Sequence, residues 1–182
     1  MLSTNQKILP PAFYNRRTLK IARELLGCFL VRKSGRKIVR AKIVETEAYV
    51  GEDDLACHAS KGRTKRTETM YGEAGHAYVY MIYGMYHCLN IVTEKKNFPA
   101  AVLIRAVEIE GVPIKETNGP GKLCRFVEID RMQNGYDITM GEKLWIERGE
   151  KVLSKDIQSA KRIGVDYAKH CKHFLWRYSY GK

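Results

Sequence analysis

The sequence has no long hydrophobic run and no segment typical of a secretion signal. None of its apolar stretches approaches the roughly 20 residues that a membrane-spanning helix needs. The N-terminal residues MLSTNQKILPP lack the basic start, apolar centre and small-residue cleavage site of a signal peptide. We therefore expect an intracellular protein without a membrane partner.

Cysteine is scarce, with five residues in a chain of 182 and no CxxC spacing. An odd count without such a motif argues against a disulfide framework and favours a reducing compartment. Three cysteines adjoin a histidine, but neighbouring residues on a strand point to opposite faces and rarely bind one ion. The HCKH run at His170–His173 has a closer spacing without a second pair of ligands. We predict no metal site.

The chain also lacks internal repeats, low-complexity tracts and shifts in composition that would separate domains. Its 182 residues, 45% of them hydrophobic, are enough to form one globular core without disulfide bonds. We expect a single domain over residues 1–182, with residues 1–12 as a flexible N-terminus.

Acidic residues are fewer than basic ones. The chain has 20 Asp and Glu and 32 Lys and Arg, which gives a formal net charge of +12. The basic residues are spread through the chain rather than gathered in a tail, which favours a folded domain with a positive face. A polyanion is the natural partner of such a face. Charge that serves only solubility is the alternative.

The hydrophobic pattern predicts an α+β domain with a mainly antiparallel sheet. A helix is expected from Thr18 to Leu26, with Thr18 as its N-cap and Gly27 at its end. Turns are expected at Ser34–Gly35 and at Tyr83–Gly84. Strands are expected over Cys28–Lys33, Lys37–Val50, Ala77–Ile82, Tyr86–Thr93, Ala101–Val107, Leu144–Ile146 and Phe174–Tyr178, and a second helix over Lys122–Glu128.

The strand expected over Lys37–Val50 has two faces, because side chains alternate along a strand. One face carries Ile43, Glu45, Glu47 and Tyr49, and the other carries Val44, Thr46 and Ala48. Glu47 and Tyr49 can therefore face a common cavity. Asp53 and Asp54 follow this strand and resemble the caps of a short helix that leads to His58.

Two stretches place carboxylates and tyrosines in this basic chain, namely ETEAY at Glu45–Tyr49 and YVYMIYGMYHCLN at Tyr78–Asn90. Aromatic faces stack on bases, basic charge attracts phosphates, and a carboxylate in a basic groove can activate water. The combination indicates chemistry on a nucleobase. The pattern alone does not separate Glu45 from Glu47 as the active carboxylate. It also fits Glu47 as an exposed carboxylate paired with a lysine, and Tyr80 as an ordinary core aromatic.

Five blocks in one order resemble the alkyladenine (3-methylpurine) DNA glycosylase family. They are VETEAY at Val44–Tyr49, His58, YVYMIYGMY followed by Asn90, Leu103–Arg105, and GPGKLC at Gly119–Cys124. The resemblance implies the fold of that family, a curved antiparallel sheet flanked by helices. It also implies a monofunctional enzyme that flips damaged purines out of double-stranded DNA and hydrolyses the N-glycosidic bond, leaving an abasic site. No cofactor is implied, and we expect a monomer in the bacterial cytoplasm at the nucleoid, or in the nucleus of a eukaryote.

The same resemblance assigns the catalytic pair and the base pocket. Glu47 corresponds to the general base, and Arg105 helps it to hold the attacking water. Tyr49, His58 and Tyr80 form the pocket for the flipped base. Asn90 corresponds to the residue that excludes guanine by a clash with its exocyclic amino group.

The remaining assignments concern DNA. Tyr83 resembles the wedge that enters the gap left by the flipped nucleotide, with Met85 beside it. Gly121, Lys122 and Arg162 are candidates for contacts with the DNA backbone. A Walker ATP site is unsupported, because Leu123 follows Lys122 where Ser or Thr would be needed.

Three other functions compete with this interpretation. A zinc deaminase also flips bases, but its H-x-E and P-C-x-x-C motifs are absent. A non-catalytic DNA- or RNA-binding domain would use the same charge and aromatic residues without needing Glu47 or Arg105. A bifunctional glycosylase-lyase needs an amine nucleophile, and the many lysines leave that alternative open on sequence alone.

Overall fold

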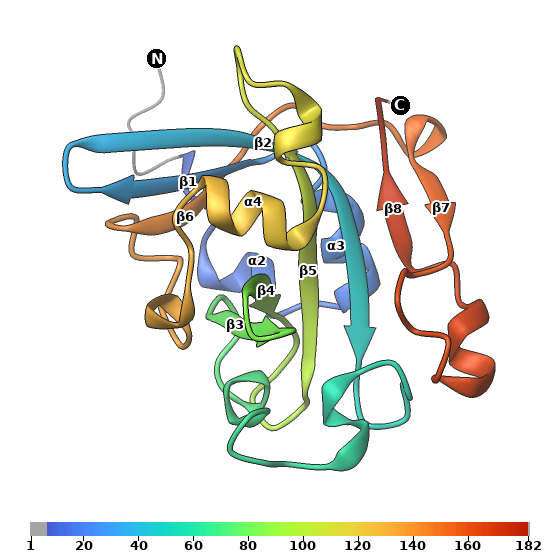
Figure 1. Cartoon of the computed structure of the whole chain (residues 1–182). Coiled ribbons are helices and arrows are strands. Elements are labelled where there is room, and N and C mark those ends of the chain that lie inside the picture. Colours follow the sequence, from blue (N-terminus) through green and yellow to red (C-terminus); the bar gives the residue numbers. More distant parts are fainter. Residues whose placement is uncertain (1–6, 182) are drawn as a thin grey trace.

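Strands β2 and β5 lie at the centre of an antiparallel, eight-stranded sheet (Figure 1). The computed structural model describes residues 7–181. The strand order is β3-β4-β5-β2-β1-β6, with β8 paired to β2 and β7. The strands are β1 Phe29–Ser34, β2 Lys37–Val50, β3 Ala77–Ile82, β4 Tyr86–Val92, β5 Ala100–Glu108, β6 Leu144–Glu147, β7 Gln158–Ala160 and β8 Arg177–Ser179. The α-helices are α2 Pro11–Tyr14, α3 Thr18–Glu24 and α4 Pro120–Phe126, and 3₁₀ turns include η1 His58–Lys61 and η2 Glu68–Tyr71.

The long strand β2 changes partner along one of its edges. Its first half pairs with β1 from Lys37 to Lys42, and β8 takes over at Glu45. The opposite edge pairs with β5 from Lys42 to Val50. Glu47 is therefore held between Leu103 of β5 and Arg177 of β8, so its backbone has a strand partner on each edge.

Two compensating β-bulges lie in the β2–β5 pair, and they correct one of our predictions. The register runs from Ile43↔Val107 to Glu45↔Ala106 and then to Thr46↔Ile104, so it passes over Val44 on one strand and Arg105 on the other. Each extra residue reverses the alternation of the side chains that follow it. Ile43 therefore lies in the core with Ala48, and not on the face of Glu45 and Glu47 as strict alternation predicted.

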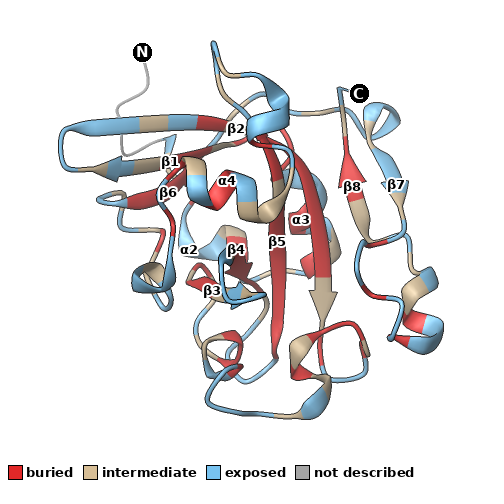
Figure 2. Cartoon of the chain, viewed as in Figure 1, coloured by how far each residue is buried: buried red, intermediate tan, exposed pale blue. Residues whose placement is uncertain are grey.

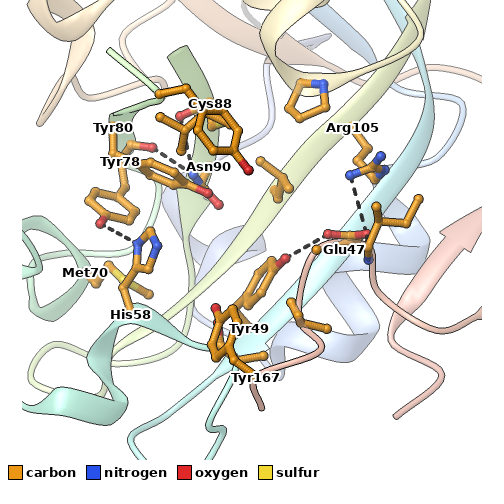
Figure 3. A pocket seen from close by; sticks show the side chains of 18 residues that line it. Glu47, Tyr49, His58, Met70, Tyr78, Tyr80, Cys88, Asn90, Arg105 and Tyr167 are labelled. Atoms are coloured by element: carbon orange, nitrogen blue, oxygen red, sulfur yellow. Dashed lines mark hydrogen bonds and ion pairs between the residues drawn. The ribbon is translucent and has the colours of Figure 1, made fainter. Parts of the chain in front are cut away.

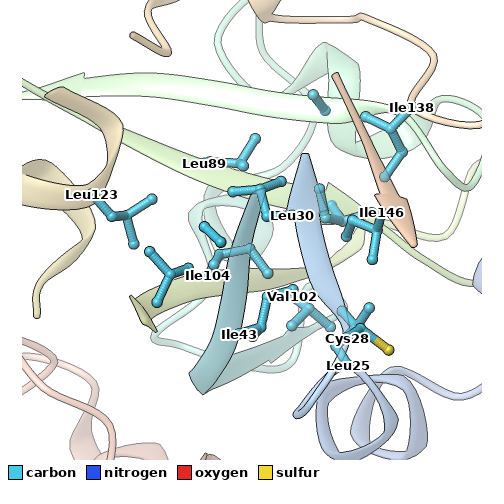
Figure 4. Packing of buried hydrophobic residues seen from close by; sticks show 14 of the residues in the cluster. Leu25, Cys28, Leu30, Ile43, Leu89, Val102, Ile104, Leu123, Ile138 and Ile146 are labelled. Atoms are coloured by element: carbon cyan, nitrogen blue, oxygen red, sulfur yellow. The ribbon is translucent and has the colours of Figure 1, made fainter. Parts of the chain in front are cut away.

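The hydrophobic core lies between the sheet and the short helices (Figure 4). Helix α3 contributes Ile21 and Ala22, with Leu25 just beyond its end, and helix α4 contributes Leu123, all of them fully buried. The hydroxyl of Thr46 donates a hydrogen bond of 2.8 Å to the carbonyl of Ala22, which fixes α3 on β2. Figure 2 shows β5 buried along almost its whole length.

The chain near its N-terminus packs more firmly than expected. Leu9 is fully buried and donates its N–H to the carbonyl of Ile146 at 2.9 Å. Ile8 forms a bridge with Glu147, and α2 begins at Pro11. The prediction of a flexible segment is therefore wrong for residues 8–12, whereas residues 1–6 lie outside the described part of the chain.

Thr18 is not the N-cap that we predicted for α3. Arg17 occupies the cap position without a side-chain hydrogen bond, and Thr18 is the first residue of the helix. Glu94 supplies the missing acceptor, since its carboxylate receives the Thr18 N–H at 2.7 Å and the Thr18 hydroxyl at 2.8 Å. A remote carboxylate thus satisfies the helix terminus and favours its dipole.

Candidate active site

A cavity of about 370 Å³ opens where β2, β3, β4 and β5 present side chains to one side (Figure 3). A loop after β7 and the 3₁₀ turn η1 close its remaining walls. The lining residues are Glu47, Tyr49, Ala56, His58, Met70, Tyr78, Tyr80, Ile82, Tyr83, Cys88, Asn90, Leu103, Arg105, Pro120, Ile163, Gly164, Val165 and Tyr167. The structure thus brings together every residue predicted for the catalytic pair and the base pocket.

Glu47 lies on the wall of this cavity with no exposure to bulk solvent. The hydroxyl of Tyr49 donates to one of its carboxylate oxygens at 2.8 Å, and the N–H of Ile163 donates to the other at 2.9 Å. The Arg105 guanidinium lies 3.6 Å from that second oxygen. Burial raises the pKa of Glu47 above its ordinary value, and Arg105 and the two hydrogen bonds oppose that shift. A carboxylate whose pKa moves toward neutrality is suited to act as a general base.

The geometry separates Glu45 from Glu47, which the sequence pattern could not. One oxygen of Glu45 accepts hydrogen bonds from Arg105 at 3.1 Å and from Arg177 at 3.0 Å. Glu45 is not among the residues that line the cavity, whereas Glu47 is. Glu45 therefore orients Arg105 toward the cavity, and Glu47 is the carboxylate that can meet a ligand.

An aromatic group forms the wall opposite Glu47. His58 pairs through Nδ1 with the Tyr78 hydroxyl at 3.0 Å, and its ring lies 4.5 Å from that of Tyr80 in an edge-to-face arrangement. Burial, reinforced by Arg66 and Lys61, lowers the pKa of His58 to about 4. His58 is therefore neutral at pH 7 and offers hydrogen bonds without adding charge to the cavity.

Asn90 is held rigidly beside these rings. It is only 3% exposed, and its amide nitrogen donates to the backbone carbonyls of Tyr78 at 3.2 Å and Cys88 at 3.4 Å. These bonds leave the side chain with one position at the cavity wall. A fixed polar group of this kind can discriminate between purines by shape.

Tyr83 stands at the tip of the β3–β4 hairpin, at the mouth of the cavity. Its φ is 51° and that of Gly84 is 69°, left-handed values at both central residues of the turn that the Met85 N–H closes on the carbonyl of Ile82 at 3.1 Å. Three residues, Tyr83 to Met85, thus connect the two strands, since Ile82 pairs with Tyr86. A tyrosine seldom adopts such a φ. Tyr83 is 85% exposed and Met85 is 66% exposed, so both side chains project into solvent where a DNA duplex could meet them.

Comparison with known proteins identifies the family. A model described as "Methylpurine-DNA glycosylase (MPG)" matches residues 12–182. A protein of Methanocella arvoryzae is 51% identical over 94% of this chain and 91% of its own length. Relatives in Clostridium perfringens (44% identical, 91% of this chain and 92% of the relative) and Legionella pneumophila (47%, 93% and 92%) are similar along comparable lengths. All three carry the name "Putative 3-methyladenine DNA glycosylase".

The chain belongs to the methylpurine-DNA glycosylase family. It is a DNA glycosylase, a hydrolase of N-glycosyl bonds in DNA repair, and the family resemblance read from the sequence is confirmed. The α+β architecture with an antiparallel sheet is also confirmed. Within residues 7–181, no helix is long and apolar enough to cross a membrane.

Two of the three residues predicted to meet the DNA backbone lie at the surface of the glycosylase, beside the hairpin. Gly121 is in close contact with Tyr86, because a Cβ at Gly121 would come within 2.9 Å of that side chain. Lys122 is exposed and donates to the carbonyl of Lys115 at 2.9 Å. Both positions remain compatible with a phosphate contact, which stays a prediction.

Arg162 is not a DNA contact, and this prediction is wrong. Its side chain is fully buried and forms an ion pair with Asp54, whose side chain is 1% exposed. A buried guanidinium that is already paired cannot reach a phosphate at the surface. The prediction that Asp53 and Asp54 cap a short helix leading to His58 is also wrong, because residues 51–57 form turns and η1 starts at His58 without a side-chain cap. The Asp54 carboxylate instead accepts the N–H of Ala56 at 3.1 Å within such a turn.

Several residues that line the cavity of the glycosylase were not predicted from the sequence. Tyr78 received no role of its own from the sequence, yet its hydroxyl pairs with Nδ1 of His58 at 3.0 Å. Tyr167 and Ile163 come from a loop more than 100 positions away from Glu47, and no local motif marks them.

All five cysteines are free and buried. Burial raises the pKa of Cys88, which lines the cavity, to about 11.

Proposed function

We propose that this glycosylase removes alkylated purines such as 3-methyladenine, together with hypoxanthine and ethenoadenine, from duplex DNA. The damaged nucleotide flips into the cavity, water cleaves its N-glycosidic bond, and an abasic site remains. The observation that carries this proposal is the position of Glu47. It is a buried carboxylate held by two hydrogen bonds, 3.6 Å from an arginine, on the wall of an aromatic cavity.

The cavity suits a flat base. Its volume of about 370 Å³ falls within the usual range of small-ligand sites, about 300–1,000 Å³. The rings of Tyr49, His58 and Tyr80 can stack on an inserted purine, and such contacts contribute about 1–3 kcal/mol per base. Alkylated purines often carry a positive charge, which strengthens their attraction to aromatic faces. Asn90 at the wall would reject the exocyclic amino group of guanine.

The catalytic step follows from the carboxylate–arginine pair. Glu47 takes a proton from a water molecule that Arg105 helps to position, and this water attacks C1′ of the flipped nucleotide. The C1′–N bond breaks, and its electron pair leaves with the base. The negative charge of Glu47 also stabilises the positive charge that develops on the sugar. A positioned base of this kind contributes about a hundred- to ten-thousand-fold to the rate.

Outside the cavity, the exposed tip of the hairpin would enter the duplex. Tyr83 would fill the gap left by the flipped nucleotide and so offset part of the cost of unstacking, which is a few kcal/mol. The formal net charge of +12 supports attraction to phosphates, with Lys122 and the backbone at Gly121 as contacts. We propose that one molecule acts alone.

The test is single-turnover base release from duplexes that carry one hypoxanthine or one methylated adenine. We expect wild type to release the base and Glu47→Gln to be slower by about a hundred- to ten-thousand-fold, with DNA binding retained. Glu108→Gln, an exposed carboxylate at the end of β5, is the matched control and should keep full activity. Tight binding without release on any lesion would sink the proposal and favour a binding protein.

A further inference from the structure

A second arginine–carboxylate pair adjoins the residues that donate hydrogen bonds to Glu47. Arg162 contacts both oxygens of Asp54, at 2.5 Å through one terminal nitrogen and at 2.7 Å through the other. The two side chains are 0% and 1% exposed. Such a bidentate, desolvated pair has one preferred geometry, unlike a surface ion pair.

The guanidinium of Arg162 joins separate segments of the chain. It donates to the carbonyl of Ala48 on β2 at 2.9 Å and to the carbonyl of Cys171 at 3.2 Å. It also lies over two rings, with 4.9 Å to the centre of Tyr49 and 5.0 Å to that of Trp176. The loop that contains Arg162 is thereby fixed against the end of β2.

Both hydrogen-bond donors to Glu47 adjoin this arginine. The N–H that donates to Glu47 belongs to Ile163, the next residue in the chain. The hydroxyl that donates to the other oxygen belongs to Tyr49, whose ring stacks on Arg162. A displacement of Arg162 would therefore move both donors at once.

We propose that Arg162, locked by Asp54, is a positioning residue that sets the orientation and the proton affinity of Glu47. The inference rests on the proposed role of Glu47 as the base. Because the Ile163 N–H and the Tyr49 hydroxyl stabilise the ionised carboxylate, their displacement would leave Glu47 protonated to higher pH. The acid limb of base release would then move to higher pH, while DNA affinity would not change.

The purely structural alternative is that the pair only holds the loop. Loss of the pair would then lower stability and the amount of folded enzyme without moving the titration of Glu47. The other titratable and charged groups around Glu47 are not substituted in any of the variants compared. They are Glu45 and Tyr49 on β2, Tyr80 on β3, Cys88 on β4, Arg105 on β5 and Arg177 on β8.

The experiment follows the Glu47 carboxyl by ¹³C NMR in the free protein, with the resonance assigned by its loss in Glu47→Gln. The main variant is the double substitution Asp54→Asn/Arg162→Gln. It removes one positive and one negative charge together, so the net charge stays the same. Any shift in the pKa of Glu47 then reports the loss of the pair's geometry. It also avoids leaving a single buried charge unpaired, which threatens folding.

We expect Glu47 in the double variant to titrate about one pH unit higher than in wild type, which corresponds to about tenfold slower base release on the acid limb. Arg162→Lys retains the charge but lacks the bidentate fork, and it should show a shift in the same direction. A folded double variant whose Glu47 titrates as in wild type would overturn the inference.

The control variant is Arg40→Gln. Arg40 also pairs with a carboxylate, that of Glu147 at 2.9 Å, and lies over the Phe29 ring at 3.3 Å, but it does not line the cavity. It should leave the titration of Glu47 unchanged. The base-release assay tests the proposed function separately. That function fails if wild type releases no base or if Glu47→Gln remains active. The NMR titration of Glu47 decides the role of Arg162 in either case.

Discussion

The two faces of the β2–β5 pair are built from the same strands but differ in what they contact. On the core face, Thr46 and Ala48 pack with Ile104 and Val102 under α3, and all four are at most 1% exposed. On the other face, Glu47 borders the cavity, where its carboxylate is surrounded by polar hydrogen-bond donors.

The difference shows how a sheet can carry an ionisable group at its centre. The core face obtains stability from apolar burial, which requires no directional partners. The cavity face contains a buried carboxylate, and its desolvation is offset only in part by Tyr49, Ile163 and Arg105. We therefore expect substitutions on the core face to change mainly stability, and substitutions on the cavity face to change mainly activity.

The largest effect is expected on the core face, from Ile104→Ala. Ile104 is a residue of β5 that is fully buried in the core. Its truncation should lower the free energy of unfolding by about 2–5 kcal/mol. Denaturant unfolding measures this loss, with Ile38→Ala, a position 60% exposed on β2, as the control. A drop in base release per folded molecule would contradict the division between the faces.

Arg105→Gln should have the largest effect on the cavity face after the loss of Glu47 itself. We expect base release to slow by about a hundredfold, typical of removing one oriented charged donor. The free energy of unfolding should fall by less than in Ile104→Ala, because Arg177 still binds Glu45 at 3.0 Å. Glu47 also keeps its hydrogen bonds from Tyr49 and Ile163. Arg177→Gln is the matched control, since it shares the Glu45 partner but does not line the cavity. Equal rate losses in both variants would place Arg105 in a purely structural network.

Glu47→Gln should stabilise the protein at neutral pH. Burial raises the pKa of Glu47 in the folded state, so the folded protein binds this proton more tightly than the unfolded chain does. The stability contributed by Glu47 is therefore lost as the pH rises from the ordinary pKa of a glutamate, about 4.5, through the higher pKa of the folded protein. We expect Glu47→Gln to gain about 0.5–2 kcal/mol at pH 8 and to lose this advantage below pH 4.

Urea unfolding of wild type and Glu47→Gln at several pH values measures this difference. Glu108→Gln is again the control, and it should show no pH-dependent gain. A gain for Glu47→Gln that is the same at pH 4 and pH 8 would show that the charge is not its cause.

The smallest effect on stability is expected from Tyr83→Asn, outside both faces. The side chain is 85% exposed, and asparagine tolerates the left-handed φ of 51° at this position. The free energy of unfolding should stay within about 0.5 kcal/mol of wild type, while base release from duplex DNA falls. Met132→Ala, also exposed at 84%, is the control. Unchanged base release by Tyr83→Asn would remove the wedge role.

Much of this arrangement could be predicted because it follows from local patterns. The β3 strand and its turn at Tyr83–Gly84 were recognised from alternation and from the glycine, and the structure confirms both. The second helix was predicted over Lys122–Glu128, and the structure places it two residues earlier, at Pro120–Phe126, with Pro120 in its first turn. Glu47 and Arg105 entered through the family resemblance, and the structure places them 3.6 Å apart.

The rest depended on contacts between distant parts of the chain. No residue type marks the bulge at Val44, which arises from the pairing of β2 with β5. Arg162 looked like surface charge because its partner, Asp54, lies 108 positions away. The donor from Ile163 is a backbone N–H, which every residue except proline carries, so its position in space alone gives it a role.

The five buried cysteines have a practical consequence for observing this enzyme on DNA. Maleimide dyes react with thiolates, and burial raises the pKa of Cys57 to about 12 and that of Cys88 to about 11. A single cysteine introduced at the exposed position of Met132 would therefore be labelled far faster than any native thiol. Single-molecule tracking of lesion search could then use the protein with its natural cysteines in place.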